Sequence, residues 1–299
     1  MCAAVRRIVD AHHHLWDLEV CNYPWLMAKG EKRFFGDPAP IQKNYLVEDL
    51  RSDAAPLVLS GSVHVQVGVS PGDELAESRW LNAQAQATGL PSAIVAACNL
   101  ERDDLEAALD AQQQLAPVRG VRQIIGRADA EDRVTGSGRL LDDPRWRAAL
   151  PLLVERSLSF DLQLTPALTQ RAAEVFGDVP DLRLALCHCG SPWDQTGEGL
   201  RSWRRGLEAI AELPNAVCKL SGLGMFDHAW SAASVRPLLE ACLDVFGADR
   251  CLFGSNFPVD KLHGSYAAIV AALDAVLQGA PESDKASVYE GNARRFYRF

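Results

Sequence analysis

The sequence predicts an α/β fold, a (β/α)8 barrel of the TIM type with a long loop after its first strand. Three observations predict it. Short apolar runs alternate with longer amphipathic stretches along all 299 residues, the apolar runs number eight, and reactive side chains gather where most of these runs end. No repeat, low-complexity linker or shift in composition marks a boundary, so we expect residues 1–299 to form a single domain.

The expected strands are short apolar runs, which is the pattern of strands that are buried in a parallel sheet. They cover residues 6–11, 59–67, 92–100, 118–125, 158–165, 182–190, 216–222 and 250–256. An active site in such a barrel lies at the carboxyl ends of the strands, so candidate site residues are expected at those ends.

The stretches between the strands repeat their apolar residues at three- and four-residue spacing, as the buried face of a helix does. The expected helices cover residues 73–87, 102–114, 142–157, 169–178, 198–213, 232–247 and 265–278. Residues 18–45 are rich in Trp, Tyr, Pro and Lys and show no periodicity. A loop of this length after the first strand is expected to lie over the barrel mouth as a lid or wall.

Composition excludes several classes of protein. A net charge of −9 gives no basic surface for nucleic acid, and no run reaches the roughly 18 apolar residues of a membrane span. The eight cysteines form no CxxC pair and several lie in strand-like runs, which is typical of buried, reduced thiols in a cytoplasmic protein. We therefore expect a cytoplasmic protein that acts on a small molecule, and a homo-oligomer stays open.

Three consecutive histidines follow the first strand. Because side chains alternate across a strand, His12 and His14 share one face while His13 points to the other and is expected to pack behind the strand. Two imidazoles on one face can hold a metal ion or a substrate oxyanion. Burying both without partners would be costly, which favours a functional site over a structural one.

Polar residues stand at seven of the eight expected strand ends. Besides the histidines they are His64, Gln66, Arg122, Gln123, Asp161, Gln163, His188, Lys219, Ser221, Asn256 and Asp260. Taken singly, a residue such as Gln66 or Gln163 is more often a hydrogen-bonded structural group. Their coincidence on one edge of the barrel predicts a site.

Four segments together resemble the amidohydrolase superfamily, and more closely its amidohydrolase-related (amidohydrolase-2) branch. They are "VDAHHHLWD" (9–17), "CHCG" (187–190), "FGSNFPVD" (253–260) and "GNARRFYRF" (291–299). This branch includes lactonases that act on sugar lactones and on 2-pyrone-4,6-dicarboxylate, and a sister group of decarboxylases. The resemblance implies a hydrolase that opens a lactone ring.

The resemblance also implies a set of metal ligands. His12 and His14 match the HxH of strand one, and His188 matches the histidine of strand six. Gln163 stands where a bridging histidine is usual, and Asn256 stands where an aspartate is usual. A two-metal centre is therefore not expected. One divalent ion, zinc by preference, on His12, His14 and His188 and catalysis without a metal are both left open.

The implied reaction needs a polarised carbonyl group and a base for water. The resemblance gives polarisation to His12, His14 and any metal, with help from Arg122. An amide such as Asn256 has no useful basicity, so Asp260 is the expected base, with His188 as the second candidate.

Other residues are expected to bind the substrate. Arg122 and Lys219 suit an acidic group or the developing oxyanion. The remaining candidates are His64, Gln66, Gln163, Trp16 and Trp193, with Tyr23 and Trp25 as further lid aromatics that could equally pack without touching a ligand.

Two other functions compete with lactone hydrolysis. One is a metal-dependent decarboxylase of the same superfamily, against which Asn256 counts. The other is a catalytically silent binder of a sugar acid or lactone, which Asn256 favours because it replaces the usual basic residue.

Overall fold

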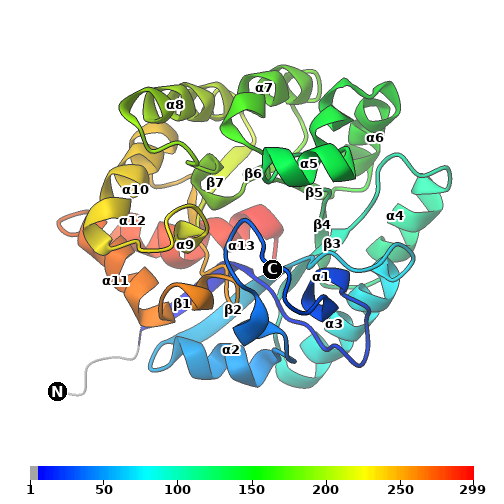
Figure 1. Cartoon of the computed structure of the whole chain (residues 1–299), viewed down its shortest axis with the longest axis horizontal. Coiled ribbons are helices and arrows are strands. Elements are labelled where there is room, and N and C mark those ends of the chain that lie inside the picture. Colours follow the sequence, from blue (N-terminus) through cyan, green and yellow to red (C-terminus); the bar gives the residue numbers. More distant parts are fainter. Residues whose placement is uncertain (1–5) are drawn as a thin grey trace.

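The computed structural model describes residues 6–299 and contains one sheet of eight parallel strands in the order β1 to β8 (Figure 1). The strands are β1 (Arg7–His13), β2 (Val58–Val65), β3 (Ala93–Ala97), β4 (Val118–Arg122), β5 (Ser159–Leu162), β6 (Leu184–Leu186), β7 (Ala216–Leu220) and β8 (Cys251–Phe253). Backbone hydrogen bonds from Asn256 to His12 and from His14 to Phe257, both 2.7 Å, join the two edges of the sheet. The result is a nearly closed barrel, which confirms the predicted fold class.

Helices alternate with the strands, and most of them form a ring around the barrel (Figure 1). They are α1 (Pro24–Met27), α2 (Val47–Ala54), α3 (Glu74–Thr88), α4 (Leu105–Gln113), α5 (Asp129–Thr135), α6 (Pro144–Glu155), α7 (Thr169–Gly177), α8 (Gly197–Ala211), α9 (Leu223–Phe226), α10 (Ala232–Phe246), α11 (Tyr266–Val276), α12 (Glu282–Ala286) and α13 (Asn292–Tyr297). Each of the seven expected helices is present, as α3, α4, α6, α7, α8, α10 and α11. Their apolar residues face the barrel because that face is the one that can be removed from water.

Several strands end earlier than predicted. Residues 187–190 continue the apolar run of β6, but His188–Gly190 forms a 3-10 turn in which His188 and Cys189 have positive φ. Asn256 after β8 also has a positive φ, of 56°. A positive φ is incompatible with an extended strand, so the regular strand conformation ends before these residues.

The barrel interior is closed at the end where the strands begin. A buried cluster joins small apolar residues of the strands to Ala293, Phe296 and Tyr297 of α13. Arg119 and Arg183, at the starts of β4 and β6, donate hydrogen bonds to backbone carbonyls of this C-terminal segment. Helix α13 therefore plugs one end of the barrel, so a ligand can enter only from the other.

The loop after β1 folds across the open end. Trp16 and Tyr45 exchange two backbone hydrogen bonds of 3.0 Å, which tie the start of this loop to its end. The segment between them contains α1 and lies over the centre of the barrel in Figure 1. This is the lid or wall that its length predicts.

The thiols are buried, as predicted. The seven cysteines from Cys21 onward are all buried and unpaired, and Cys2 lies outside the described residues. Across residues 6–299, no helix is long and apolar enough to cross a membrane.

Candidate active site

A small cavity of about 70 Å³ opens at the carboxyl ends of the strands. It is lined by His14, Trp25, Arg33, Phe34, Phe35, Val67, Arg122, Ile124, Arg127, Gln163, His188, Met225, Asn256 and Val259. Five of the predicted site residues meet here, from the ends of β1, β4, β5, β6 and β8: His14, Arg122, Gln163, His188 and Asn256. A neighbouring hollow of about 580 Å³ shares Trp25, Arg33, Val67, Arg122, Ile124 and Arg127 with it and also reaches Gln66.

His14 has a fixed tautomer. Its Nδ1 lies 2.7 Å from the backbone carbonyl oxygen of Val65, which can only accept, so Nδ1 carries the proton. Burial, then the charge of Arg122, lowers the pKa of His14 to about 3. The ring is therefore neutral, and its Nε2 presents a lone pair to the cavity.

Asn256 links His14 to a buried carboxyl group. Its Nδ2 donates a 3.0 Å hydrogen bond to Asp260, and its Oδ1 lies 3.3 Å from His14 Nε2. Two acceptors thus face each other, and a hydrogen-bond donor or a cation beside them would satisfy both. Asp260 also accepts a bond from the Gly224 amide, and burial raises its pKa to about 7. It lies behind Asn256 and does not line the cavity.

His188 is held by close backbone approach. Its Nδ1 lies 3.1 Å from the Ser221 hydroxyl, and its ring centroid lies 4.4 Å from that of His12. A Cβ on Gly222 would come within 2.7 Å of His188 Nδ1, so only glycine fits there. Burial, then the charge of Arg122, places the pKa of His188 well below its usual value. This imidazole also faces the cavity in its neutral form.

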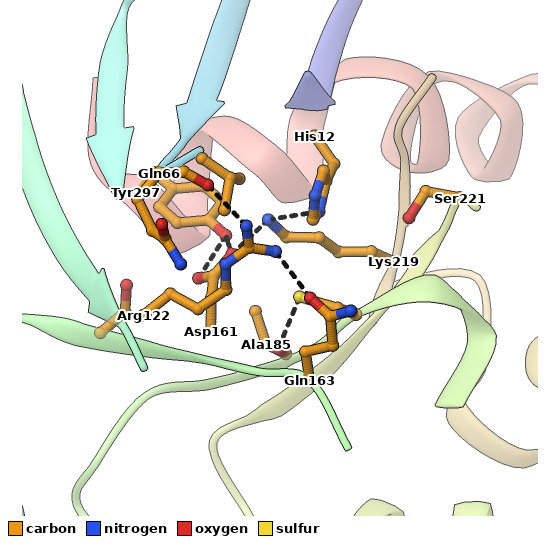
Figure 2. A network of polar contacts seen from close by, with 12 residues as sticks. His12, Gln66, Arg122, Asp161, Gln163, Ala185, Lys219, Ser221 and Tyr297 are labelled. Atoms are coloured by element: carbon orange, nitrogen blue, oxygen red, sulfur yellow. Dashed lines mark hydrogen bonds and ion pairs between the residues drawn. The ribbon is translucent and has the colours of Figure 1, made fainter. Parts of the chain in front are cut away.

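Arg122 is a buried cation without a counter-ion. Its Nη1 donates to the Gln163 side chain at 2.9 Å and its Nη2 to the Gln66 backbone carbonyl at 2.6 Å (Figure 2). Its Nε has no partner, and no carboxylate of residues 6–299 lies within ion-pair distance. Burial lowers the pKa of Arg122, because the charged form has lost its water.

Two further arginines line the cavity from the loops. Arg33, on the loop after β1, donates two hydrogen bonds of 3.0 and 2.8 Å to Glu131 of α5. Arg127 lies 3.6 Å from the same carboxylate, and its Nε has no partner. Three arginines and a single glutamate give this wall a positive charge.

Four predicted binding residues lie away from the small cavity. His64 Nδ1 accepts a hydrogen bond from the Leu15 amide at 3.1 Å, and its Nε2 lies 3.9 Å from Glu77, so both ring nitrogens face groups of the protein. Trp16 is buried and donates to the Lys43 carbonyl at 2.6 Å. Trp193 packs on Phe34 with centroids 5.2 Å apart. Lys219 is buried below the site. His13 packs near His64, with centroids 6.1 Å apart.

The buried Lys219 belongs to a polar column in the barrel (Figure 2). Its ammonium group forms an ion pair with Asp161, and it lies 3.5 Å from His12 Nδ1. The Tyr297 hydroxyl, from the plug helix α13, lies 2.9 and 3.1 Å from the two oxygens of Asp161. The column thus runs from the plugged end of the barrel up to the first histidine of the site.

Known proteins resemble this chain along nearly its whole length. The Amidohydrolase family profile matches residues 9–299. The chain belongs to the amidohydrolase family. Among its relatives, the uncharacterized protein y4mH of Sinorhizobium fredii is 37% identical, over 97% of this chain and 98% of that protein. An L-fucono-1,5-lactonase of Burkholderia ambifaria is 26% identical, over 97% of this chain and 95% of that protein.

The amidohydrolase fold is also shared with solved structures. A crystal structure of a Burkholderia multivorans amidohydrolase with bound zinc superposes with a TM-score of 0.82 at 24% identity, covering 99% of this chain and 100% of that one. At this identity the likeness shows the fold alone. It agrees with the eight-stranded barrel described above.

One group of side chains in this amidohydrolase has the spacing of metal ligands. Within the described part of the chain, the ligand atoms of His12, Asp161 and Cys187 all lie within 4.8 Å of one another. The predicted trio shares only His12 with this group. His12 lies 5.2 Å from His14 and 4.4 Å from His188 between ring centroids. The role of the trio as ligands stays a prediction.

Several cavity residues of this amidohydrolase could not be found from the sequence. Arg33, Phe34 and Phe35 lie in the loop without periodicity, and Met225 and Val259 lie beyond the expected strands. Arg127 offered the one usable signal, a basic residue five positions after Arg122 at a strand end.

Proposed function

We propose that this amidohydrolase hydrolyses a lactone that carries an acidic group, such as a sugar-acid or pyrone-type carboxylic lactone. The observation that carries the proposal is Arg122, a buried cation without a counter-ion beside two neutral imidazoles. The lactonase relative, similar over nearly its full length, supports the reaction type. The positive wall supports the acidic group.

The arginines divide the work of binding. Arg122 has an unpartnered Nε and is the expected partner of the substrate acid or of the developing oxyanion. Arg33 and Arg127 share Glu131, which leaves one positive charge more than their counter-ion neutralises. An anion in the cavity would therefore gain electrostatic attraction that a neutral lactone lacks. The larger hollow beyond these arginines provides room that the 70 Å³ cavity does not.

When no metal ion claims its imidazole, His188 is proposed as the base that takes a proton from water. It lines the cavity, and Asp260 does not. When His188 Nδ1 donates to the Ser221 hydroxyl, Nε2 has a lone pair free for the proton. His14 Nε2 and Asn256 Oδ1 accept the second hydrogen of the same water, and Asp260 acts as a positioning residue that turns the Asn256 amide toward His14.

Substrate charge strengthens this base. The positive charge of Arg122 is one cause of the low pKa of both His14 and His188. A substrate carboxylate paired with Arg122 neutralises that charge, so the pKa of each histidine rises when substrate binds. The base is then stronger in the complex than in the free enzyme, which favours acidic over neutral lactones.

At most one divalent ion per chain is proposed, with zinc preferred. The facing lone pairs of His14 and Asn256 fit a cation, with His188 as the third ligand; His12 fits poorly because its Nδ1 faces the Lys219 ammonium group. Such an ion would polarise the lactone carbonyl. Two tightly bound equivalents in elemental analysis of protein purified without chelator would contradict the proposal.

A lactone panel tests the function. Matched acidic and neutral lactones are incubated with enzyme and a pH indicator, and we expect acid release that is faster for the acidic member of each pair. His188→Gln should lower kcat by roughly 100-fold or more, because general base catalysis contributes about that much. His228→Gln, at an exposed histidine outside the cavity, is the control.

Two other results would identify the competing functions. Carbon dioxide release from an acid without ring opening would indicate the decarboxylase. A rise in melting temperature with a lactone but no acid release would indicate the silent binder, because a ligand that binds only the folded state stabilises it.

A further inference from the structure

The ammonium group of Lys219 occupies a position between metal-type ligands. It extends from β7 and is fully buried, and its ion-pair partner Asp161 is also fully buried. The imidazole of His12 lies on its other side, 3.5 Å from Nδ1 to Nζ (Figure 2). A divalent ion bound by His12, Asp161 and Cys187 would have to take the place of this ammonium group.

Each member of the ligand group already has a partner within the chain. Asp161 accepts from Lys219 through one oxygen, and the Tyr297 hydroxyl lies within hydrogen-bond distance of both. The Cys187 thiol donates to the Ala185 carbonyl oxygen at 3.8 Å, and burial raises its pKa to about 12. A metal binds the thiolate, so an ion at this group would have to displace the thiol proton as well as the Lys219 ammonium group.

The same ammonium group decides the tautomer of His12. An ammonium has three donors and no acceptor, so the Nδ1 that faces it must offer its lone pair. In the neutral ring the proton then sits on Nε2, which is buried and has no partner in the described chain. A protonated Nε2 cannot ligate a metal, so His12 is also unavailable to an ion shared with His14 and His188.

We propose that Lys219 is a built-in substitute for a divalent ion: its ammonium group supplies the fixed positive charge below the active site and holds His12 with its proton on Nε2. Its charge acts on the imidazoles of His12, His14 and His188. Lys219 is thus a positioning residue, and its catalytic benefit rests on the proposed hydrolase function. The residues of the His12 group do not fit a metal while the lysine is present.

Removing the ammonium group tests this directly. Lys219→Ala opens the space and leaves Asp161 without its cation, so a metal can enter. We expect this variant to bind one Co²⁺ more per chain than the wild type, at least about 10-fold tighter than any wild-type binding at this group. Coordination by the Cys187 thiolate should add a near-ultraviolet charge-transfer band. Zn²⁺ should raise the melting temperature of the variant more than that of the wild type.

Matched variants separate this effect from general damage. Lys219→Met removes the charge but fills the space, and should gain no ion. Lys219→Ala combined with Cys187→Ser should lose the charge-transfer band. Lys285→Met, at a half-buried lysine that pairs with Glu282 on α12, should behave as the wild type.

Two results would overturn the proposal. One is a wild-type protein that already binds Co²⁺ with the thiolate band. The other is a folded Lys219→Ala variant that gains no ion. If that variant does not fold even when Zn²⁺ is present, the tautomer of His12 in the wild-type protein tests the proposal. Nitrogen-15 NMR of the histidine rings measures it, and the spectrum of His12→Gln assigns the His12 signal. A His12 proton on Nε2 supports the proposal, and a proton on Nδ1 refutes it.

These measurements do not depend on turnover. If the lactone panel shows no hydrolysis, the metal content and the His12 tautomer still test Lys219. If lactones are hydrolysed but Lys219→Ala gains no ion, only the present proposal fails.

Discussion

The amide of Asn256 is oriented by its hydrogen bond to Asp260 and meets His14 at its other end. Asp260 accepts from its Nδ2, and His14, whose Nδ1 proton is committed to Val65, leaves a lone pair against its Oδ1. A positive φ places Asn256 at the tip of the turn after β8, a conformation that asparagine tolerates better than most residues. The residue thus completes an acceptor pair and needs no basicity to do so.

Asn256→Asp tests what this pair binds. A carboxylate beside His14 Nε2 adds negative charge where a cation would sit, so we expect zinc affinity to rise at least about 10-fold. Competition with a chelator measures it, and Asn215→Asp, at an exposed asparagine, is the control. Unchanged zinc affinity in the folded variant would show that no cation binds between His14 and residue 256.

Glu77 predicts a pH dependence of stability. It is fully buried, and burial raises its pKa from 4.5 to about 8. The folded protein therefore keeps a proton that the unfolded chain releases above about pH 4.5. The contribution of Glu77 to the free energy of unfolding is full below that pH and is lost as the pH rises to about 8, by an amount on the order of a few kcal/mol.

Glu77→Gln removes this titration. The fall in melting temperature between pH 5 and 8 should be shallower in the variant than in the wild type, as scanning calorimetry can measure. Glu106→Gln, at an exposed glutamate of α4, should keep the wild-type slope. Parallel curves for Glu77→Gln and the wild type would count against a protonated buried carboxyl group.

At the scale of elements, the site depends on turns that bring the ends of neighbouring strands into contact. His188 reaches the cavity because Gly222, which has a positive φ, lets the turn after β7 approach the turn after β6 closely. Such approach needs residues without a Cβ.

Gly222→Ala should therefore damage the site more than the fold. The backbone term costs about 1 kcal/mol, and the new Cβ, 2.7 Å from His188 Nδ1, pushes the imidazole out of place. We expect kcat to fall at least about 10-fold, since small misplacements of a reacting group cost that much or more. Gly89→Ala has a similar positive φ but open space around it, and should lose stability without losing activity.

Periodicity identified every strand and the main helices, because burial on both faces of the strands and on one face of the helices leaves a direct trace in the apolar pattern. It placed His14, Arg122, His188 and Asn256 at the mouth for the same reason. It could not show that the Lys219 side chain extends toward Asp161 inside the barrel and not toward the cavity at the mouth. The position of a residue on a strand is compatible with either course of a long, flexible side chain. It also missed Arg33, whose place depends on an aperiodic loop.

At the scale of the whole molecule, the plug and the site are parts of one polar column. Tyr297 of α13 binds Asp161, Asp161 binds Lys219, and Lys219 faces His12. Each partner is buried, so a polar group that lost its hydrogen bond here would have neither a protein partner nor water, and the folded state would be destabilised. We therefore expect helix packing at one end of the barrel to be coupled to the imidazoles at the other.

Tyr297→Phe tests that coupling. Asp161 loses its hydroxyl donor inside the barrel, so we expect the free energy of unfolding to fall by about 1–3 kcal/mol in urea denaturation. Tyr45→Phe breaks a comparable bond to Asp53, but Asp53 keeps Lys261 and some solvent as partners. An equal loss in both variants would mean that the column adds nothing beyond an ordinary hydrogen bond.

The plug helix α13 is the last element of the barrel to be synthesised. Helix α13 follows all eight strands in the chain, yet its Phe296 and Tyr297 belong to the same buried cluster as Val9, Val63 and Val95. While a ribosome is still translating the segment after β8, the strands that have already emerged have no cover for the start of the barrel. Until α13 has been made, these apolar side chains stay exposed to water, and such exposed surface makes an incomplete barrel prone to aggregation.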